Sequence, residues 1–349
     1  MTKVIFYKYS VYGNNFILID EIPSGNRIPE FNKKLFSRLS LNKYYGIGGD
    51  NILFLQINSN DTLININSTH NYWNKHPIVN QNAEYVFRMF EPNGEEALCC
   101  GNGLMCIALH IHNYYNKTET GIITEIPAQQ PVIRRVKWIE DKQYEVNLGH
   151  PSTIPNRLIN SSTLIRITDE INQIVLRTEF EQNSLELIGY LIYTGEPHLV
   201  FYEMPENRHF FNVLFEKETT NYIERSNHAI RQIGIDLNNQ TSIFPEGINV
   251  NFARIAKTMD NAIEYRCFER GILRETLACG TGALATASIA HELRLINDAN
   301  IEIIPCRGRW EEPYKSAKIL AIKEGTSSWR IIGTPKLNFK GSIEVERLI

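Results

Sequence analysis

The feature that most constrains the fold of this chain is an internal duplication. Around Cys100 the sequence reads FEPNGEEALCCGNGLMCIA, and around Cys279 it reads FERGILRETLACGTGALATA. Both segments begin with Phe-Glu and continue as Glu-x-Leu-x-Cys-Gly-x-Gly into an apolar stretch, with one extra residue in the second copy. A repeated segment of this kind predicts two similar structural units in one chain.

Two weaker matches precede these copies in the same order. GNNFI from Gly13 resembles GEPHL from Gly195, and GIGGDNILF from Gly46 resembles GINVNFARI from Gly247. The shared order favours duplication over coincidence, and 349 residues are enough for two domains. Since each half carries one cysteine of the repeat, we expect an active site in the cleft between the halves.

The hydrophobic pattern predicts a mixture of strands and two main helices. Apolar runs at 103–114 and 282–293 are typical of buried helices. The segment 58–85, rich in Asn, Ser and His, is expected to be an insertion or a long loop. Strands are expected to dominate elsewhere. Residues rich in β-branched and aromatic side chains predict strands at 3–9, 16–20, 52–57, 190–202 and 318–322.

Charge and composition exclude several classes of protein. The formal net charge of -3 and the absence of a basic run argue against nucleic-acid binding. The N-terminal residues do not resemble a signal peptide, and no uncharged apolar run is long enough to cross a bilayer. We therefore expect a cytoplasmic protein without a membrane partner, whose six cysteines are kept reduced.

Metal binding is not expected from the cysteine and histidine spacing. There is no CxxC pair, and the pair Cys100 and Cys106 has no second ligand cluster matched to it. His110 and His112 are two residues apart, which is not the ligand spacing of a helix. Four cysteines are predicted to be small buried apolar side chains. They are Cys99, Cys106, Cys267 and Cys306.

The position of Cys100 and Cys279 just before a predicted helix suggests chemistry. Unpaired backbone N–H groups and the helix dipole stabilise a thiolate there, and they lower the thiol pKa. The glycines that follow allow a ligand to approach the backbone, and a carboxylate suits a helix N-terminus. An amino acid held by both helix starts would place its Cα between two sulfurs. One thiolate would remove the α-proton and the other thiol would return a proton to the opposite face, without pyridoxal phosphate or a metal.

At these residues the sequence resembles the diaminopimelate epimerase family. The resemblance covers nearly the whole chain, and the closing GTPKLNFKGSIEV from Gly333 is similar to the C-terminal strand of the family. The motifs that carry it are GNNFILID at Gly13, GIGGDN at Gly46, CGNG at Cys100, GEPH at Gly195, FPEGINVNF at Phe244, and ERG…ETLACGTG at Glu269.

The resemblance implies an α+β fold with two pseudosymmetric domains. Each would be a curved, mostly antiparallel β-sheet wrapped around a central α-helix, with the active site in the interdomain cleft. In such folds the C-terminal strand returns to the N-terminal domain. The domains would then comprise residues 1–140 with 338–349, and residues 141–337.

The resemblance also implies an activity and a set of site residues. The activity would be the cofactor-independent epimerisation of LL-diaminopimelate to meso-diaminopimelate, a step towards lysine and peptidoglycan precursors. Cys100 and Cys279 fall on the catalytic pair, and Glu269 and His198 on the residues that support proton transfer. Further positions match the binding of the substrate. Gly101, Asn102, Gly103, Gly280 and Thr281 fall on the cradle of the α-carboxylate, and Asn14, Asn249 and Arg270 on other substrate-binding positions.

Three departures from the family concern the distal end of the substrate. Glu91 and Glu196 stand where the family has asparagines that hold a distal carboxylate, and Asn51 shortens a glutamine. An ionised glutamate repels a carboxylate, which favours a cationic amino acid such as lysine, ornithine, arginine or histidine. Arg270 is retained and leaves diaminopimelate open as the substrate, but it could instead pair with one of the new glutamates.

Two other classes of function remain open on the sequence. One is a relative of the same fold that isomerises another substrate without a thiol pair, against which both cysteines argue. The other is a non-catalytic ligand-binding protein or thiol redox sensor, which would not need glycines in both halves. The expected partner is a small amino-acid substrate, and the oligomeric state, a homodimer included, is left open.

Overall fold

A computed structural model of the chain divides into two compact units. Unit 1 comprises Met1–Asn147 and Ile332–Ile349, and unit 2 comprises Leu148–Ile331. The two predicted domains differ from these units by a few residues at each boundary. None of the described helices is long and apolar enough to cross a membrane. The structure describes residues 3–75, 79–160, 162, 164–180, 183–216, 220–257, 259, 261–312, 314–326 and 328–344.

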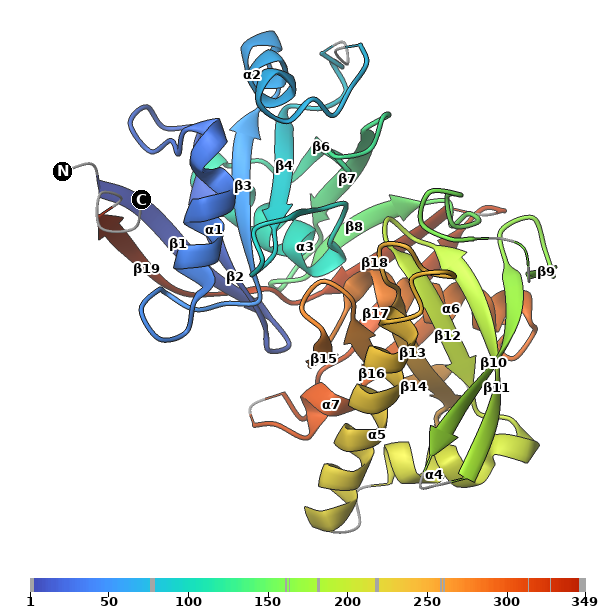
Figure 1. Cartoon of the computed structure of the whole chain (residues 1–349). Helices are drawn as coiled ribbons and strands as arrows, with labels where there is room; N and C mark the ends of the chain where they lie inside the picture. The colour runs from blue at the N-terminus through green and yellow to red at the C-terminus, as the bar shows by residue number, and fades with distance from the viewer. Residues whose placement is uncertain are drawn as a thin grey trace. The chain divides into compact units, whose positions relative to one another are not determined.

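Unit 1 is a curved sheet whose C-terminal strand pairs with its first strand (Figure 1). The pairs β2–β3 and β4–β6 are parallel, and the other neighbours are antiparallel. The C-terminal strand therefore returns to the N-terminal unit, as the family resemblance implies. In spatial order the strands are β19 (Lys336–Glu344), β1 (Lys3–Val11), β2 (Asn14–Asp20), β3 (Asn51–Ile57), β4 (Tyr85–Phe90), β6 (Glu119–Thr124), β7 (Val132–Trp138) and β8 (Tyr144–Gly149).

Unit 2 repeats this order of parallel and antiparallel pairs. Its parallel pairs are β12–β13 and β14–β16, which correspond to β2–β3 and β4–β6. The duplication predicted from the sequence is thus present in the topology, and the predicted α+β fold class is confirmed. The strands are β10 (Asn172–Phe180), β11 (Asn183–Tyr193), β12 (Pro197–Tyr202), β13 (Asn249–Ile255), β14 (Ala262–Glu269), β16 (Asn300–Pro305) and β17 (Ile319–Glu324), with β9 (Ile165–Arg166) beside β10 and β18 (Ser328–Gly333) after β17.

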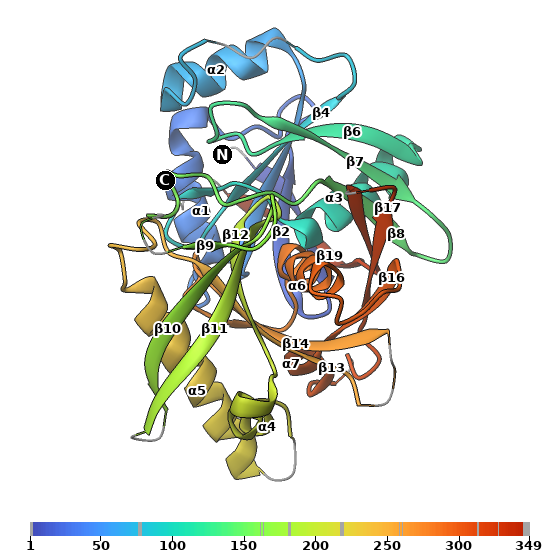
Figure 2. The ribbon, with the colours of Figure 1, turned by 90° about the vertical axis from the view of Figure 1, so that its right-hand side faces the viewer.

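Each unit has a buried central helix. Helix α3 (Gly101–Tyr115) packs against β1, β7 and β19, and helix α6 (Gly280–Glu292) packs against β11 to β14, β16 and β17. Figure 2 shows α6 almost end-on, with strands of its unit around it. Both helices confirm the sequence prediction and begin two residues earlier than expected. They begin there because a cysteine side chain caps each one and the glycines form the first turn.

Two segments differ from what the sequence predicted, one expected to be a loop and the other a single strand region. The predicted loop 58–85 contains helix α2 (Asn60–His70), which is capped by Ser59 and buries Leu63 and Ile66 beside Trp73. Residues 76–78 of that segment lie outside the described residues. The predicted strand region 190–202 is two strands, β11 and β12, with a turn between them at Gly195, whose φ is +96°.

A long helix, α5 (Thr220–Asn238), lies where strands were expected. Its buried residues Ala229, Ile230, Ile233 and Leu237 follow the spacing of a helix, a signal that the strand-based interpretation overlooked. The helix packs against β14, and a Cβ on its Gly234 would come within 2.3 Å of the Phe268 ring. The other short helices are η1 (Glu30–Asn32), α1 (Lys33–Leu41), η3 (Pro205–Asn207), α4 (Arg208–Phe215) and α7 (Cys306–Arg309).

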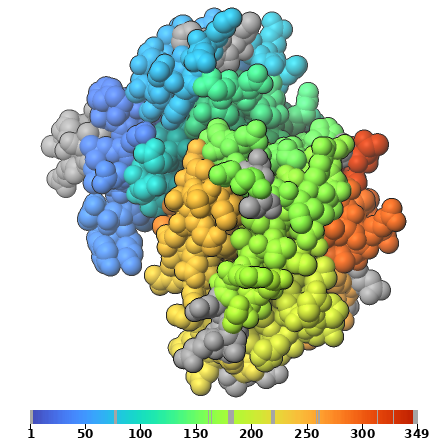
Figure 3. Space-filling view, turned by 45° about the vertical axis from the view of Figure 1, so that its right-hand side comes forward, coloured from blue at the N-terminus to red at the C-terminus, as the bar shows by residue number. Residues whose placement is uncertain are grey.

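One face of the hairpin formed by β10 and β11 is exposed to solvent. Its residues form much of the yellow-green surface in Figure 3. Val175 and Ile188 are partners in the register of the two strands, and both are exposed. Apolar side chains therefore face solvent at this hairpin, whereas the core of the unit lies around α6.

A buried arginine closes the hairpin before each central helix. In unit 1, Arg88 of β4 donates to Glu96 of β5 (Glu96–Ala97) at 2.6 and 2.5 Å. In unit 2, Arg266 of β14 donates to Glu275 of β15 (Arg274–Thr276) at 2.6 and 2.7 Å. Both arginines are almost inaccessible to solvent. These two-point ion pairs hold the turns that lead into Cys100 and Cys279.

Loss of one partner of this ion pair should destabilise unit 2. Glu275→Gln removes the charge that faces buried Arg266, and we expect the free energy of unfolding to fall by about 3 kcal/mol in a urea titration. The matched control is Glu186→Gln, because Glu186 pairs with Arg177 on the surface at 3.1 Å, with side chains 56% and 80% exposed. This control should change the free energy by less than about 1 kcal/mol. Equal losses in the two variants would contradict a structural role for the buried pair.

Candidate active site

Cys279 caps the N-terminus of α6 with its own side chain. Its sulfur accepts a hydrogen bond from the backbone N–H of Gly282 at 3.4 Å and lies 3.5 Å from the hydroxyl of Thr281. The hydroxyl of buried Tyr265 accepts from the N–H of Cys279 at 2.7 Å and donates to its carbonyl at 2.9 Å. The backbone of Cys279 is therefore fixed on both sides, and the sulfur is fixed at the positive end of the helix.

The surroundings of Cys279 favour its thiolate. The pKa of the Cys279 thiol is lowered from its ordinary value, first by a hydrogen bond from Cys267 and further by those from Thr281 and the backbone of Gly282. Burial and the charge of Glu196 act in the opposite direction. Burial and the same hydrogen bond raise the pKa of Cys267 well above its usual range, so Cys267 stays a neutral donor. We predicted Cys267 to be only a small apolar residue; it is buried, but it lies beside Cys279.

A chain of hydrogen bonds supports Thr281. The side-chain amide of Asn251 lies 3.0 Å from Nδ1 of His198, and Nε2 of His198 lies 3.1 Å from the Thr281 hydroxyl. Because an amide nitrogen only donates, Nδ1 accepts and Nε2–H donates to Thr281, whose proton then points to Cys279. Burial lowers the pKa of His198 to about 3, so the ring is neutral at physiological pH. Thr281 therefore lies between His198 and Cys279 in this chain of hydrogen bonds.

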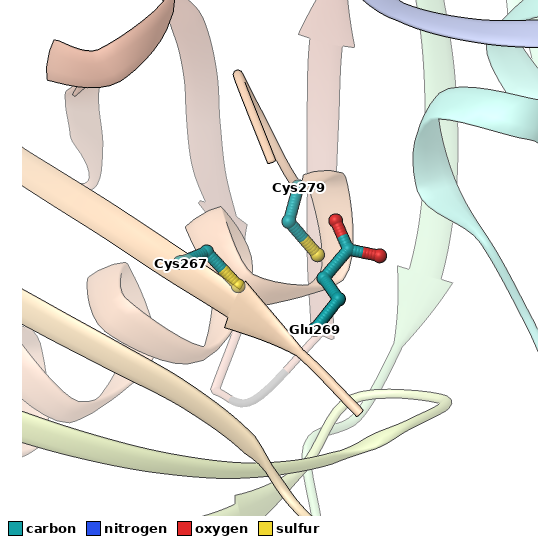
Figure 4. Close-up of side chains that lie close together, drawn as sticks. All are labelled: Cys267, Glu269 and Cys279. Carbon is teal, nitrogen blue, oxygen red and sulfur yellow. The ribbon is translucent and has the colours of Figure 1, made fainter. Parts of the chain in front are cut away.

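The carboxylate of Glu269 lies next to the same sulfur. Glu269 is the last residue of β14, and its Oε1 accepts from the Thr276 hydroxyl at 2.5 Å. Figure 4 shows it beside Cys267 and Cys279. The two sulfurs and a carboxylate oxygen all lie within 4.8 Å of one another. The structure thus brings Glu269, predicted to support proton transfer, to the thiol that it would serve.

Arg270 is paired with Glu196 rather than held apart from it. Nη2 and Nε of Arg270 donate to Glu196 at 2.7 and 3.2 Å, and both side chains are largely buried. The backbone N–H of Arg270 donates to the side chain of Asn249 at 3.0 Å. The Arg270 guanidinium also donates to the carbonyl of Glu246 at 3.0 Å. This is the arrangement anticipated as one of the two alternatives for Arg270.

Unit 1 offers a similar but simpler arrangement. Cys100 caps α3, and its sulfur accepts from the backbone N–H of Gly103 at 3.3 Å. Its thiol is half-buried, whereas that of Cys279 is buried. Gly101, Asn102 and Gly103 form the buried first turn, and a Cβ on Gly103 would lie 3.3 Å from the Phe87 ring. The first turn of α3 therefore has little room for larger side chains.

The strand register gathers the predicted binding residues of each unit at one end of its sheet. In unit 1, Asn51 is the register partner of Phe16, and Ile52 is the partner of Phe90. Unit 2 has the same register, with Asn249 opposite His198 and Val250 opposite Phe268. Predicted site residues that belong to these pairs, or lie within two residues of them, consequently share one end of each sheet. They are Asn14, Asn51 and Glu91 in unit 1, and Glu196, Asn249 and Glu269 in unit 2.

The glycine-rich turn before Asn51 is held by Asp50. The carboxylate of Asp50 accepts from the backbone and side chain of Asn15 at 2.8 and 3.1 Å. A Cβ on Gly46 would lie 2.2 Å from a backbone oxygen, and Gly48 has φ of +74°. This explains the GIGGD pattern as a turn that positions the start of β3.

Several contributing residues were missed by the sequence analysis. Asn251 and Cys267 each lie two residues from a predicted site residue on the same strand, Asn249 and Glu269 respectively. Since alternate residues of a strand share a face, this spacing was the available signal. Tyr265 continues the pattern one step further along β14.

Comparison with known proteins decides the family. Diaminopimelate epimerase of Methanothrix thermoacetophila is 30% identical over 309 residues, which cover 85% of each chain. The chain belongs to the diaminopimelate epimerase family. Proteins of the same name from Archaeoglobus fulgidus and Buchnera aphidicola subsp. Baizongia pistaciae are 28% and 25% identical, over 84% and 93% of this chain and 83% and 95% of their own. No protein-family model matches the chain.

Solved structures support the fold. A hydroxyproline epimerase from Agrobacterium vitis is 12% identical, with a TM-score of 0.62 over 98% of this chain and 92% of its own. A probable proline racemase from Agrobacterium radiobacter K84 is also 12% identical, with a TM-score of 0.59 over 98% of this chain and 93% of its own. Together with its family, this makes the chain an isomerase of the cofactor-independent epimerase or racemase class.

Removal of the Thr281 hydroxyl should weaken the thiolate of Cys279. The hydroxyl lowers the pKa of that thiol, so in Thr281→Val the pKa rises and less thiolate is present at neutral pH. Alkylation of Cys279 by iodoacetamide, followed by peptide mass spectrometry across pH, should shift to higher pH. Thr281→Ser keeps the hydroxyl and should retain the original profile. An unshifted profile in Thr281→Val would show that this hydrogen bond does not set the reactivity.

Proposed function

We propose that this protein is an amino-acid epimerase that uses the thiols of Cys100 and Cys279 as its two bases. The observation that carries the proposal is the same local structure at the start of α3 and α6. In each, a cysteine sulfur accepts a backbone N–H at the N-terminus of a buried helix whose first turn contains two glycines. This arrangement stabilises a thiolate and leaves backbone donors for a carboxylate.

The proposed reaction is a proton exchange at the α-carbon. The thiolate of one cysteine removes the α-proton, and the S–H of the other returns a proton to the opposite face. Backbone donors at the cradle stabilise the charge that develops on the α-carboxylate. The cradle consists of Gly101, Asn102, Gly103, Gly280 and Thr281. No cofactor takes part, because the two thiols hold and deliver both protons.

Glu269 and His198 would have different supporting roles. A carboxylate oxygen of Glu269 lies within 4.8 Å of the Cys279 sulfur, so Glu269 would take the thiol proton through one bridging water or after a side-chain rotation. His198 is buried and neutral, so its role is to hold the Thr281 hydroxyl towards the sulfur. The support of Cys279 thus combines a nearby base with fixed donors.

Diaminopimelate is the first candidate substrate, with conversion of the LL to the meso form as the reaction. Its support is the name shared by the relatives at 25–30% identity over most of the chain. Asn14, Asn51, Asn249 and Arg270 would bind the remainder of the substrate. In this role the Arg270 guanidinium would receive the distal carboxylate alongside Glu196.

A cationic amino acid is the second candidate, and the pair of Arg270 with Glu196 favours it. The two largely buried charges neutralise each other at 2.7 Å, so a distal carboxylate would have to compete with Glu196 for the guanidinium. A lysine, ornithine, arginine or histidine side chain does not bind the guanidinium, so it does not depend on opening this pair. It would be attracted by the carboxylate of Glu91, which is a second negative charge at the predicted distal end of the substrate.

A substrate panel tests both the mechanism and the specificity. The purified reduced protein is incubated with LL-diaminopimelate, lysine, ornithine, arginine, histidine and glutamate, and stereoisomers are separated by chiral chromatography. One member should be epimerised, and Cys100→Ser and Cys279→Ser should each lower its rate by about 100-fold or more. The proposal would be overturned if both variants kept their activity. It would also be overturned if the native protein epimerised no member of the panel.

The double variant Glu91→Asn, Glu196→Asn tests the charge argument within the same panel. If the carboxylates set specificity, kcat/KM should move towards diaminopimelate relative to lysine by about 10-fold or more, equivalent to about 1.4 kcal/mol. Glu246→Gln is the matched control, because Glu246 is more exposed and its carboxylate lies 3.8 Å from Arg270. An unchanged preference in the double variant would show that the glutamates do not select the substrate.

A further inference from the structure

Cys267, Glu269 and Cys279 form a cluster of potential metal ligands in unit 2 (Figure 4). Two of its three donors are thiol sulfurs, and the third is a carboxylate oxygen. In the proposed proton exchange, Cys279 is a base and Glu269 supports it, whereas Cys267 only donates a hydrogen bond. Within the part of the chain that the structure describes, no other group of three such residues converges in this way.

We propose that this cluster binds a thiophilic divalent cation of the Zn²⁺ class, with three protein ligands and one open position. The three donor atoms lie within 4.8 Å of one another, so a point exists that is at most 4.8 Å divided by √3, about 2.8 Å, from all of them. Zinc prefers about 2.3 Å to sulfur and about 2.0–2.2 Å to a carboxylate oxygen. Each donor therefore has to move by less than about 1 Å, which side-chain rotation can supply.

The ligands are held in place by their neighbours. The backbone of Cys279 is fixed by Tyr265, and one oxygen of the Glu269 carboxylate, Oε1, accepts from the Thr276 hydroxyl at 2.5 Å. These contacts orient the ligands and leave the side-chain torsions free for the small movements that binding needs. Cys267 and Glu269 are alternate residues of β14 and therefore share one face of the strand. A Cβ on Gly282 would lie 3.3 and 3.4 Å from the two sulfurs, so the glycine leaves the space that both occupy.

The cluster is absent from the other copy of the duplication. Cys267 and Met89 both immediately precede the repeated Phe-Glu, and they occupy equivalent register positions opposite Thr276 and Ala97. A thioether carries no proton to lose and is a weaker ligand for Zn²⁺ than a thiolate. The second thiol therefore makes unit 2 alone a candidate for binding the cation.

Binding would withhold Cys279 from catalysis, and this consequence rests on the proposed function. The S–H bond of Cys267 breaks as its sulfur coordinates the cation, and its proton goes to solvent. Cys279 coordinates as the thiolate, so its electron pair is no longer available for an α-proton. The cation would act as a reversible inhibitor, without oxidation of either sulfur.

Binding is tested with Co²⁺ alone, because thiolate ligands give it strong near-ultraviolet charge-transfer absorption. Anaerobic titration of the reduced full chain should give this absorption at one equivalent, and Zn²⁺ should abolish it by displacement. Cys267→Ala should weaken Co²⁺ binding by about 10-fold or more. Glu269→Gln provides a second ligand variant if Cys267→Ala does not fold. Cys306→Ala, which removes another buried cysteine of the same unit, should leave the absorption unchanged.

The outcomes separate this inference from the proposed function. No absorption in the native protein, or full absorption in the folded ligand variants, would overturn the metal site whatever the catalytic activity. If the two-thiol mechanism proved wrong, Co²⁺ absorption in the native protein would still show that the cluster binds a cation. If both proposals hold, Zn²⁺ should inhibit the native enzyme, and EDTA should restore its activity. Zn²⁺ should inhibit the Cys267→Ala variant less, when each enzyme is compared with its own metal-free rate.

Discussion

The two-point ion pair between a buried arginine and a glutamate is the interaction on which the rest of each unit depends. Arg88 with Glu96, and Arg266 with Glu275, close the hairpins that lead into the central helices. A buried guanidinium is stable only with its partner in place, so each hairpin has one favourable geometry. That geometry sets where the following cysteine meets the helix N-terminus, and with it the direction of the thiol.

The same scaffold supports two thiols in different environments. Cys279 is buried and receives hydrogen bonds from Cys267, Thr281 and the backbone of Gly282, which together lower its pKa. Cys100 is half-buried, and its copy of the duplication has Met89 where the other has Cys267. The duplication thus preserves backbone and capping, while the side chains around each sulfur have diverged. Such a difference suits a reaction in which one thiol gives a proton and the other takes one.

The sequence was sufficient for the duplication, the central helices and the fold class, because a repeated motif and long apolar runs are local signals. The helical spacing of the buried residues of α5 was present in the sequence but was overlooked, whereas α2 buries only Leu63 and Ile66, too few positions to define a period. Cys267 was missed as a neighbour of Cys279 for another reason, because it approaches Cys279 only when β14 packs against the start of α6. Pairing of Arg270 with a glutamate was anticipated as one of two alternatives, but the sequence did not select Glu196, which is 74 residues away. Tertiary packing decides such pairs, and no single sequence encodes them in a readable period.

The most direct test of the two-thiol account follows deuterium at the α-carbon early in the reaction. The reduced enzyme is given one stereoisomer of its substrate in D₂O, and both stereoisomers are recovered after a few per cent of turnover. The account predicts deuterium in the product but almost none in the remaining substrate, because one thiol removes the proton and the other delivers deuterium. Deuterium appearing equally fast in substrate and product, or product that keeps the original proton, would indicate a single base and contradict the account.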